Sequence, residues 1–156
     1  VALLKKYFPE FKNAELLFTA AQTGVRETRH IKGEHVLTGE EYLNAVHFEE
    51  AVSRGAHPID IHTAGDTTQK CQFLKNAAYI PYRSLIVPGF DNLLVAGRCF
   101  SADQVASASV RVQASVMGLG QAAGCAAAQC ACAGTSVHKA DVPTLQAMLR
   151  KWGALI

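Results

Sequence analysis

The sequence predicts an α/β fold in which short strands accompany one long helix built from small residues. Several short runs alternate apolar and polar side chains or are rich in β-branched residues, which is typical of strands. Residues 114–133 contain eight alanines, three glycines and three cysteines, which indicates a tightly packed helix about 30 Å long. With 49% apolar residues in a chain of 156, one core with a small appended lobe is expected.

The first predicted element is a helix over residues 10–22, where apolar side chains recur at helical spacing up to Gly24. Residues 25–38 alternate and include β-branched side chains, so one or two short strands are expected there. We therefore expect the chain to begin with a helix that leads directly into strand structure.

A capping box marks the next helix. Thr38 and Glu41 have the required spacing, which predicts a short helix over 40–46. Residues 48–58 are expected to form a loop. The alternating run 58–62 then predicts a strand with one face in water.

The middle of the chain is expected to contain two more strands. Residues 63–77 are polar and rich in turn formers, whereas 78–87 read as a strand that Pro81 interrupts. A turn is expected at Pro88 and Gly89, and 92–96 should form a short apolar strand.

The last two elements are helices, over 114–133 and 142–151, the second with Pro143 in its first turn. The long helix has the length of a membrane span, but its bulky apolar side chains are few and two glutamines interrupt it. We therefore favour a helix that packs against a sheet or touches a cofactor with one end, and no membrane partner is expected.

Charge and cysteine usage exclude several classes of protein. The net charge is +2 with scattered basic residues, so a nucleic-acid partner is not expected. Five cysteines without paired metal-ligand spacing favour neither a disulfide scaffold nor a metal site. The first nine residues lack the charge order of a signal peptide, and we expect a cytoplasmic protein.

Residues 89–137 are almost free of charge, which predicts burial nearly throughout. Within this stretch, 93–96 form an apolar run that ends at Gly97 and Arg98, and the long helix follows. A glycine turn before a helix start offers free backbone N–H groups to an anion or a polarised carbonyl. Many α/β folds contain such a unit, so the pattern alone identifies no ligand.

Several sequence motifs that follow one another in a fixed order are more specific than this single unit. The chain reads YIPYRSLI at 79–86, DNLLVAGRC at 91–99, SVRV at 109–112 and MGLGQAAG at 117–124. Together these runs resemble the C-terminal half of the FAD-dependent oxidoreductase family. RETR at 26–29, YL at 42–43 and PIDIH at 58–62 resemble the substrate-side segment of the same family. The resemblance covers residues 26–155.

The resemblance implies FAD as the cofactor and assigns roles around it. Gly97 would give backbone access to the ribityl and pyrophosphate part, with Arg98 beside it. The N–H groups of Val116 and Met117 would face a flavin carbonyl and stabilise the negative charge of the reduced ring. Family members often carry proline where this chain has Ala114. Alanine permits the helix but does not fix its first turn, so a less rigid helix start is expected.

Two residues are candidates for catalysis. Arg111 faces either the flavin or an anionic substrate, or else it forms a buried salt bridge, for which Asp103 is the nearest carboxylate in the sequence. Both readings stay open. His62 could act as a base near a substrate, because its ordinary pKa is close to neutrality. A structural histidine with satisfied hydrogen bonds is the preferred reading.

Three further arginines have two readings each. Arg26 and Arg29 either approach a substrate or lie on a solvated strand face. Arg83 either lines the substrate side or braces two strands, and we favour bracing because its neighbours read as strand.

The glycine-rich fingerprint G-x-G-x-x-G does not follow any predicted strand, since the glycines of 118–124 lie inside a helix. We therefore expect the C-terminal fragment of an FAD-binding flavoprotein, with a substrate-side lobe over 1–77 and the C-terminal part of the FAD-binding domain over 78–156. Its partners would be a small-molecule substrate and the N-terminal FAD-binding part of the same protein, and it is compatible with a homo-oligomer.

The expected reaction is hydride transfer between FAD and a small organic substrate. The alternative is a non-catalytic assembly or binding module derived from such a flavoprotein. Because only the flavin-side half of the site is expected, the chain alone should bind FAD weakly or not at all, and a purified chain that stays yellow would contradict this.

Overall fold

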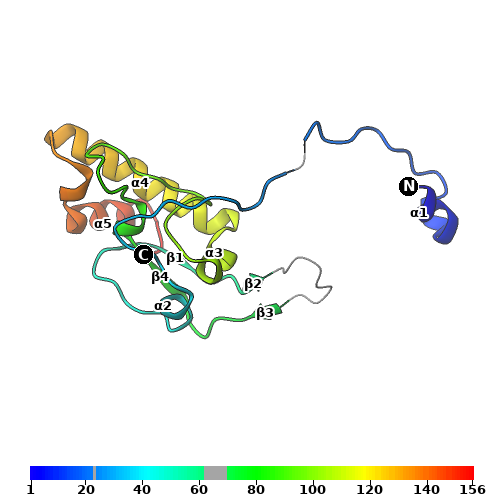
Figure 1. The fold of residues 1–156 in the computed structure, drawn as a ribbon, viewed down its shortest axis with the longest axis horizontal. Coiled ribbons are helices and arrows are strands. Elements are labelled where there is room, and N and C mark those ends of the chain that lie inside the picture. The colour runs from blue at the N-terminus through cyan, green and yellow to red at the C-terminus, as the bar shows by residue number, and fades with distance from the viewer. Residues whose placement is uncertain (23, 62–69) are drawn as a thin grey trace.

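The computed structural model describes residues 1–22, 24–61 and 70–156 (Figure 1). The α-helices are α1 (Ala2–Tyr7), α2 (Gly39–Leu43), α3 (Gln104–Val110), α4 (Gln113–Ala133) and α5 (Val142–Lys151). The strands are β1 (Ala51–Gly55), β2 (Ile59–Ile61), β3 (Lys70–Gln72) and β4 (Ala78–Pro81). Short 3₁₀ turns cover Pro9–Phe11, Tyr82–Leu85 and Val137–Lys139. The mixed helix and strand composition of the α/β prediction is confirmed in this broad sense.

The strands form two small antiparallel sheets. β1 pairs with β4, with Ser53 opposite Ile80 and Gly55 opposite Ala78, and β2 pairs with β3. A β-bulge interrupts the first ladder between Ala51 and Ser53. A sheet of only two strands is not stable by itself in water. Both sheets therefore depend on the helices that pack against them.

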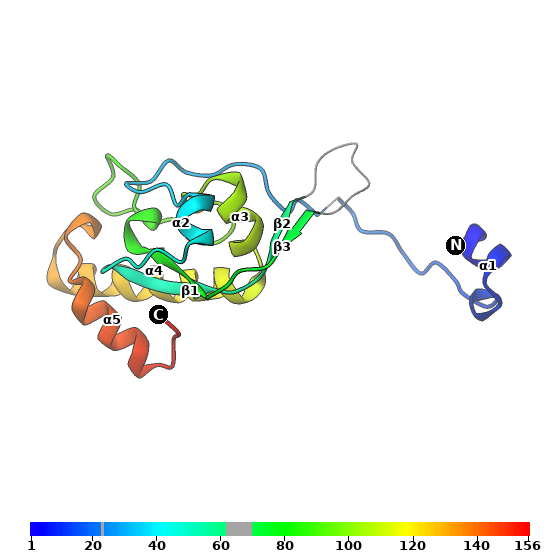
Figure 2. The same cartoon turned by 90° about the horizontal axis from the view of Figure 1, so that it is seen from below.

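The long helix α4 supplies one wall of the core. Figure 2 shows α4 running alongside β1, with α5 next to its C-terminal half, and α4 contacts both elements. The face of α4 toward the core buries Leu119, Ala122, Ala126 and Cys130. Small side chains on this face allow a close approach to the strand, as the small-residue composition predicts. The helix ends at Gly134, whose φ of 61° only glycine adopts readily.

One core joins the two halves of the chain. Leu37, Tyr42 and Val52 pack in the same buried cluster as Phe100 and Leu149. The Tyr82 hydroxyl donates a buried hydrogen bond of 2.9 Å to the Val137 carbonyl, and burial raises the pKa of this phenol. The substrate-side and FAD-side regions expected from the sequence therefore share a hydrophobic interior.

Several predicted elements are confirmed. The Thr38 and Glu41 capping box forms and begins α2, although the helix is shorter than predicted. β2 and α5 lie where they were expected, and α4 begins one residue before its predicted start. The strand predicted from Ala78 ends at Pro81 in a 3₁₀ turn, because proline has no N–H to continue the ladder.

Other predictions were wrong. Residues 14–22 are not helical, and the helices in this part of the chain are α1 and the 3₁₀ turn that follows it, Pro9–Phe11. An apolar stripe stabilises a helix only when something packs on it, and here the side chains are exposed. The predicted strands over 25–38 and 92–96 are reduced to the single bridges Leu37–Ala102 and Ile86–Leu94. Residues 25–38 do make further backbone hydrogen bonds, such as that from the Ile31 N–H to the Cys99 carbonyl, but these bonds are scattered and form no continuous ladder.

The predicted loop over 48–58 is also wrong, because it contains β1, and β3 and α3 were missed. The serine, arginine and glycine of β1 hide its strand character, which comes from pairing with β4. The signal for α3 was present, since Asp103 is its N-cap and accepts from the Ala106 N–H at 2.8 Å.

The charge-free stretch 89–137 is less buried than predicted. Met117 is 73% exposed, and Gly120, Gly124 and Ala127 are also exposed on the side of α4 away from the core. By length and composition α4 could cross a membrane, a test that core helices of soluble proteins also pass. Low charge here reflects a helix that is packed on one side and uncovered on the other.

Candidate functional site

The turn at Gly97 is held at both ends. The Val95 N–H donates to the Leu85 carbonyl at 2.8 Å, and the buried Phe100 donates its N–H to the Gly97 carbonyl at 3.3 Å. Gly97 has a φ of 91°, and a Cβ there would meet no heavy atom within 4 Å. The backbone is therefore fixed while the space beside it stays open, as a backbone contact with a ligand requires.

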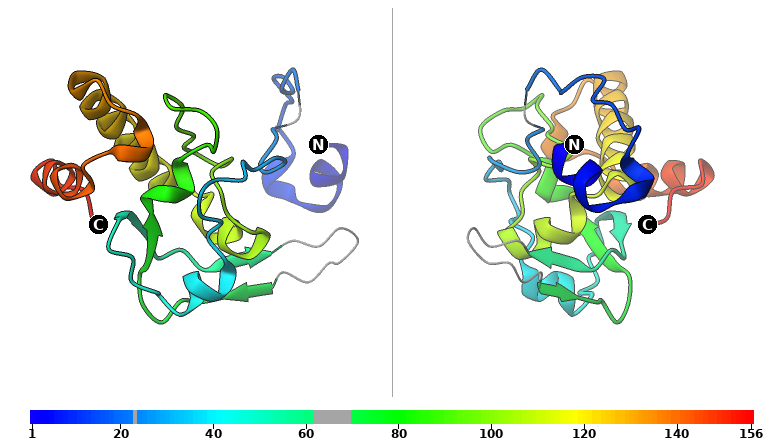
Figure 3. Two further views of the ribbon diagram at one scale, coloured as in Figure 1. Left: turned by 60° about the vertical axis from the view of Figure 1, so that its left-hand side comes forward. Right: turned by 90° about the vertical axis from the view of Figure 1, so that its right-hand side faces the viewer.

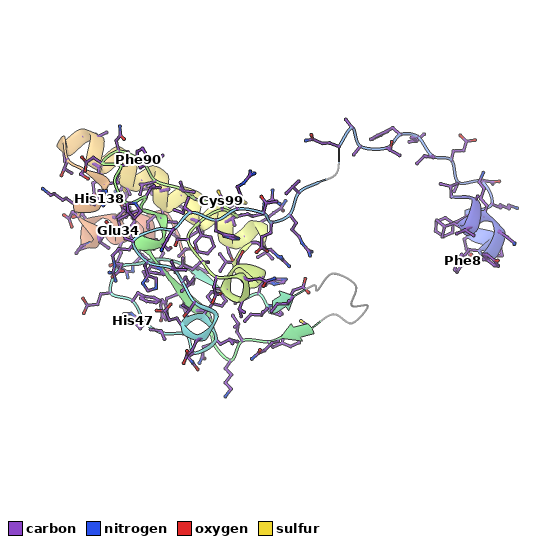
Figure 4. All side chains as sticks on the ribbon, viewed as in Figure 1. Phe8, Glu34, His47, Phe90, Cys99 and His138 are labelled. Carbon is purple, nitrogen blue, oxygen red and sulfur yellow. The ribbon has the colours of Figure 1, made fainter. Side chains whose placement is uncertain are left out.

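Arg98 lies next to this turn with an exposed side chain. Its Nη1 donates to the carbonyls of Val25 at 2.8 Å and Arg26 at 3.1 Å. These bonds hold the guanidinium in place without neutralising it, because both acceptors are uncharged. Figure 4 shows the neighbouring Cys99 on the side of the fold from which the N-terminal arm, residues 1–22, extends.

Arg111 caps the end of α3 and is paired with acidic and carbonyl groups. Its Nη1 donates to the Glu27 carboxylate at 2.6 Å, and its Nη2 donates to the Asp60 carbonyl at 2.7 Å. Its side chain is 11% exposed. An ion pair therefore forms, but not with Asp103, whose carboxylate accepts from the N–H groups of Gly39 and Ala106.

Glu27 connects Arg111 to His30, and sequence reasoning missed both Glu27 and His30. The second carboxylate oxygen of Glu27 lies 3.3 Å from His30 Nε2, and His30 Nδ1 lies 3.0 Å from the Phe100 carbonyl. Glu27 is 84 positions from Arg111 along the chain. No local pattern signals a pair so distant, so the segment around Glu27 could not be joined to Arg111 before the fold was known.

The start of α4 has free N–H groups, but not those that were predicted. The Val116 N–H donates to the Val112 carbonyl at 3.1 Å, so it is used within the helix. Val112 is the N-cap and provides no side-chain cap. The N–H groups of Gln113, Ala114 and Ser115 make no hydrogen bond within the part of the chain that the structure describes. They carry the partial positive charge of the helix start.

Hollows flank this helix start. One, of about 480 Å³, lies between β1 and α4 and includes Val112, Ala114 and Ser115 in its wall. Another, of about 510 Å³, is lined by Arg111 together with residues 26–28 and His30. Arg111, at the end of α3, thus lies near β2. Figure 3 shows α3 next to β2, and the two elements are in contact.

The other candidate residues lie away from the start of α4 or outside the residues that the structure describes. His62 lies outside the described residues, and β2, which leads to it, ends at Ile61. Met117, whose N–H group was the other predicted donor, lies inside α4 beyond Val116, and its side chain points to solvent. Arg83 braces the fold, because its Nε donates to Glu50 at 2.7 Å and thereby ties the turn after β4 to the residue before β1.

The cysteines are free thiols, and burial raises the pKa of Cys125 and Cys130. Among residues 1–22, 24–61 and 70–156, no three histidine, cysteine or acidic side chains lie close enough to hold a metal ion. Cys125 and Cys130 pack in the core face of α4, whereas Cys132 is exposed.

Comparison with protein families identifies the family of the chain. A family model described as FAD dependent oxidoreductase matches residues 1–149. The chain belongs to this family. Members of the FAD-dependent oxidoreductase family are flavoprotein oxidoreductases, and the family name gives FAD as the cofactor. Searches of curated proteins and of solved structures found no match.

The residues present fit the flavin part of FAD. A flavin needs donors for its ring carbonyls, and the uncapped start of α4 offers them without an acidic residue in its first turn. The phosphates need a cation and close backbone, which Arg98 and the open Gly97 turn provide. Among the described residues, no heavy atom lies within 4 Å of the place that a Gly97 Cβ would take.

Proposed function

We propose that this chain forms the flavin-side half of the FAD site in a flavoprotein that transfers hydride between FAD and a small organic substrate. The observation that carries the proposal is the uncapped start of α4, with three free N–H groups, between a hollow beside β1 and the hollow that contains Arg111. FAD, when bound, supplies the hydride chemistry, and the protein supplies binding, orientation and charge.

Each residue has a separate task in this proposal. The backbone at Gly97 and the guanidinium of Arg98 hold the ribityl and pyrophosphate part. The N–H groups of Gln113 and Ala114 donate to a flavin carbonyl and favour negative charge there. Arg111, paired with Glu27, fixes the end of α3 directly before the same helix start.

We propose residues 1–77 as the substrate side and 78–156 as the FAD side. Because one core spans both regions, this is a division of tasks rather than of folding units. The sequence contains no G-x-G-x-x-G turn, so an N-terminal FAD-binding part of the same protein would hold the adenosine half. A cytoplasmic location is part of the same proposal.

A substitution at the helix start tests the proposal. Ala114 is exposed in the first turn of α4, and Ala114→Asp places a carboxylate there. Helix starts favour acidic side chains, so folding should be retained. A flavin carbonyl at the same N–H groups would be repelled, and FAD affinity in the full-length protein should fall about tenfold or more.

The matched control is Ala127→Asp, which makes the same change at an exposed position farther along α4. Flavin absorbance after gel filtration and FAD titration of both variants provide the measurement. Equal FAD affinity in the two variants would show that the flavin lies elsewhere.

The alternative, an assembly module without catalysis, is favoured by one feature, the exposed apolar side chains of residues 1–18. It predicts a full-length protein that purifies without flavin absorbance and whose oligomeric state depends on that segment. Flavin absorbance in the same preparation separates the two proposals.

A further inference from the structure

Arginines gather in two adjoining hollows that share Arg26, Glu27 and Thr28 in their walls. The first hollow, of about 370 Å³, adds Val25, Arg29, Arg98 and Cys99. The second, of about 510 Å³, adds His30, Gln104 and Arg111. We refer to these two hollows together as the arginine groove. Its size suits a small molecule rather than a macromolecule.

The charges in the arginine groove do not balance. Four arginines line it, and among the residues that the structure describes Glu27 is its only acidic lining residue. Glu27 is already paired with Arg111, and the Asp60 carboxylate lies 4.0 Å from Arg111 as well. Across the described ranges, the side chains of Arg26 and Arg29 make no hydrogen bond or ion pair. Among the described residues, the first hollow therefore has three arginines in its wall and one carboxylate, Glu27, which is paired with Arg111.

The backbone that carries these arginines is fixed. Arg98 binds the carbonyls of Val25 and Arg26, so the segment is tied to the Gly97 turn. The Ile31 N–H donates to the Cys99 carbonyl at 2.9 Å, which holds the other end. Within the described residues Arg98 makes hydrogen bonds through its Nη1 alone, so its Nε and Nη2 groups can still donate to a ligand. A ligand would thus meet cations whose main chain is already ordered.

Guanidinium groups donate two parallel N–H bonds to a planar oxyanion, and this geometry suits carboxylates and phosphates. We propose that the arginine groove binds an oxyanion group of the substrate, a carboxylate or a phosphate, so that the substrate class is small organic anions. The inference rests on the proposed function for the position of the flavin. Arg111 directly precedes the N-cap of α4, so an anion in the groove would lie close to the helix start.

Calorimetric titration of the chain with succinate tests the carboxylate source, and inorganic phosphate tests the phosphate source. We expect at least one of them to bind, with an affinity that falls as ionic strength rises. The double variant Arg26→Gln and Arg29→Gln should bind about tenfold more weakly, because each guanidinium contributes charge-assisted hydrogen bonds. Both side chains are exposed, so the fold should be unaffected.

The double variant Arg150→Gln and Lys151→Gln is the matched control, since it also removes two positive charges, from exposed positions on α5 away from the groove. Its affinity should equal that of the unchanged chain. Binding of neither anion, or an equal loss in the control, would overturn the inference.

A second titration separates the substrate from the cofactor. The full-length protein is titrated with the same two anions before and after loading with FAD. If both states bind equally, Arg26, Arg29 and Arg111 hold the anion apart from the cofactor phosphates, which the proposed function assigns to Arg98. If FAD abolishes binding, the groove belongs to the cofactor and the inference fails. Loss of FAD retention with intact anion binding would instead contradict only the proposed function.

Discussion

His138 joins three segments that are far apart in the sequence. Its Nδ1 is hydrogen-bonded to the Glu34 carboxylate, and its Nε2 lies 3.1 Å from the Phe90 carbonyl. Figure 4 shows Glu34, Phe90 and His138 side by side at the C-terminal end of α4. The charged groups that face the imidazole are Glu34 and Asp91, and both favour its protonated form.

A pH-dependent stability follows from this contact. The hydrogen bond with Glu34, followed by the Phe90 carbonyl and the nearby carboxylates, raises the pKa of His138 above its ordinary 6.5. The stabilisation is therefore fully present below pH 6.5, where His138 is protonated in both states. It is lost as the pH rises through the higher pKa of the folded state.

His138→Gln measures this contribution. The difference in urea midpoint between the unchanged chain and the variant should be largest in mildly acidic buffer and should shrink in mildly alkaline buffer. His47→Gln provides the control for removing a histidine elsewhere in the fold. A difference that stays constant with pH would show that the imidazole acts only by packing.

At the scale of elements, the contact between β1 and the helices depends on Gly55. A Cβ at this position would clash with the hydroxyl of Tyr42, which is 1% exposed and accepts from Ser109 at 3.1 Å. The same Cβ would lie 3.3 Å from Ser115 Oγ in the first turn of α4. The end of β1 thus approaches α2 and α4 more closely than any larger residue allows.

Gly55→Ala should therefore lower the free energy of unfolding by about 1 to 3 kcal/mol, because the buried Tyr42 cannot move aside without strain. Gly120→Ala is the matched control, since a Cβ there meets nothing within 4 Å and alanine favours the helix by up to about 1 kcal/mol. Urea unfolding of both variants checks the pair. A Gly55→Ala protein as stable as the control would mean that the packing of Tyr42 is loose.

At the scale of the whole molecule, the N-terminal arm, residues 1–22, extends away from the body, as Figure 1 shows. No residue of α1 or of the 3₁₀ turn that follows it is buried. Large apolar side chains are nevertheless frequent in the arm: Leu3, Leu4, Tyr7, Phe8, Phe11, Leu16, Leu17 and Phe18. A segment with this composition and no partner favours association.

Deletion of residues 1–22 should leave the free energy of unfolding within about 0.5 kcal/mol of the unchanged chain, because the arm contributes nothing to the core. It should also reduce self-association, which light scattering coupled to gel filtration measures. Removal of only residues 1–6 is a shorter control that keeps most of the apolar side chains. A large loss of stability on full deletion would show that the arm packs on the body.

Local signals in the sequence predicted the elements that depend on nearby residues. The Thr38 and Glu41 box, Pro143 and the small residues of α4 each determine structure within a few positions, and the helices they predicted are present. The Asp103 cap could have predicted α3 by the same reasoning. The apolar spacing at 10–22 failed because periodicity shows that a face could pack and not that a partner exists.

Several motifs in a fixed order identify the family from the amino-acid sequence, and residue composition predicts the long helix after the Gly97 turn. Three features came instead from tertiary contacts: Glu27 holds Arg111, the free N–H groups of α4 precede Val116, and arginines from two distant segments line one groove. Helix periodicity and caps arise from interactions over a few residues. The pairing of groups 70 or more positions apart depends on how the whole chain closes, which no local pattern records.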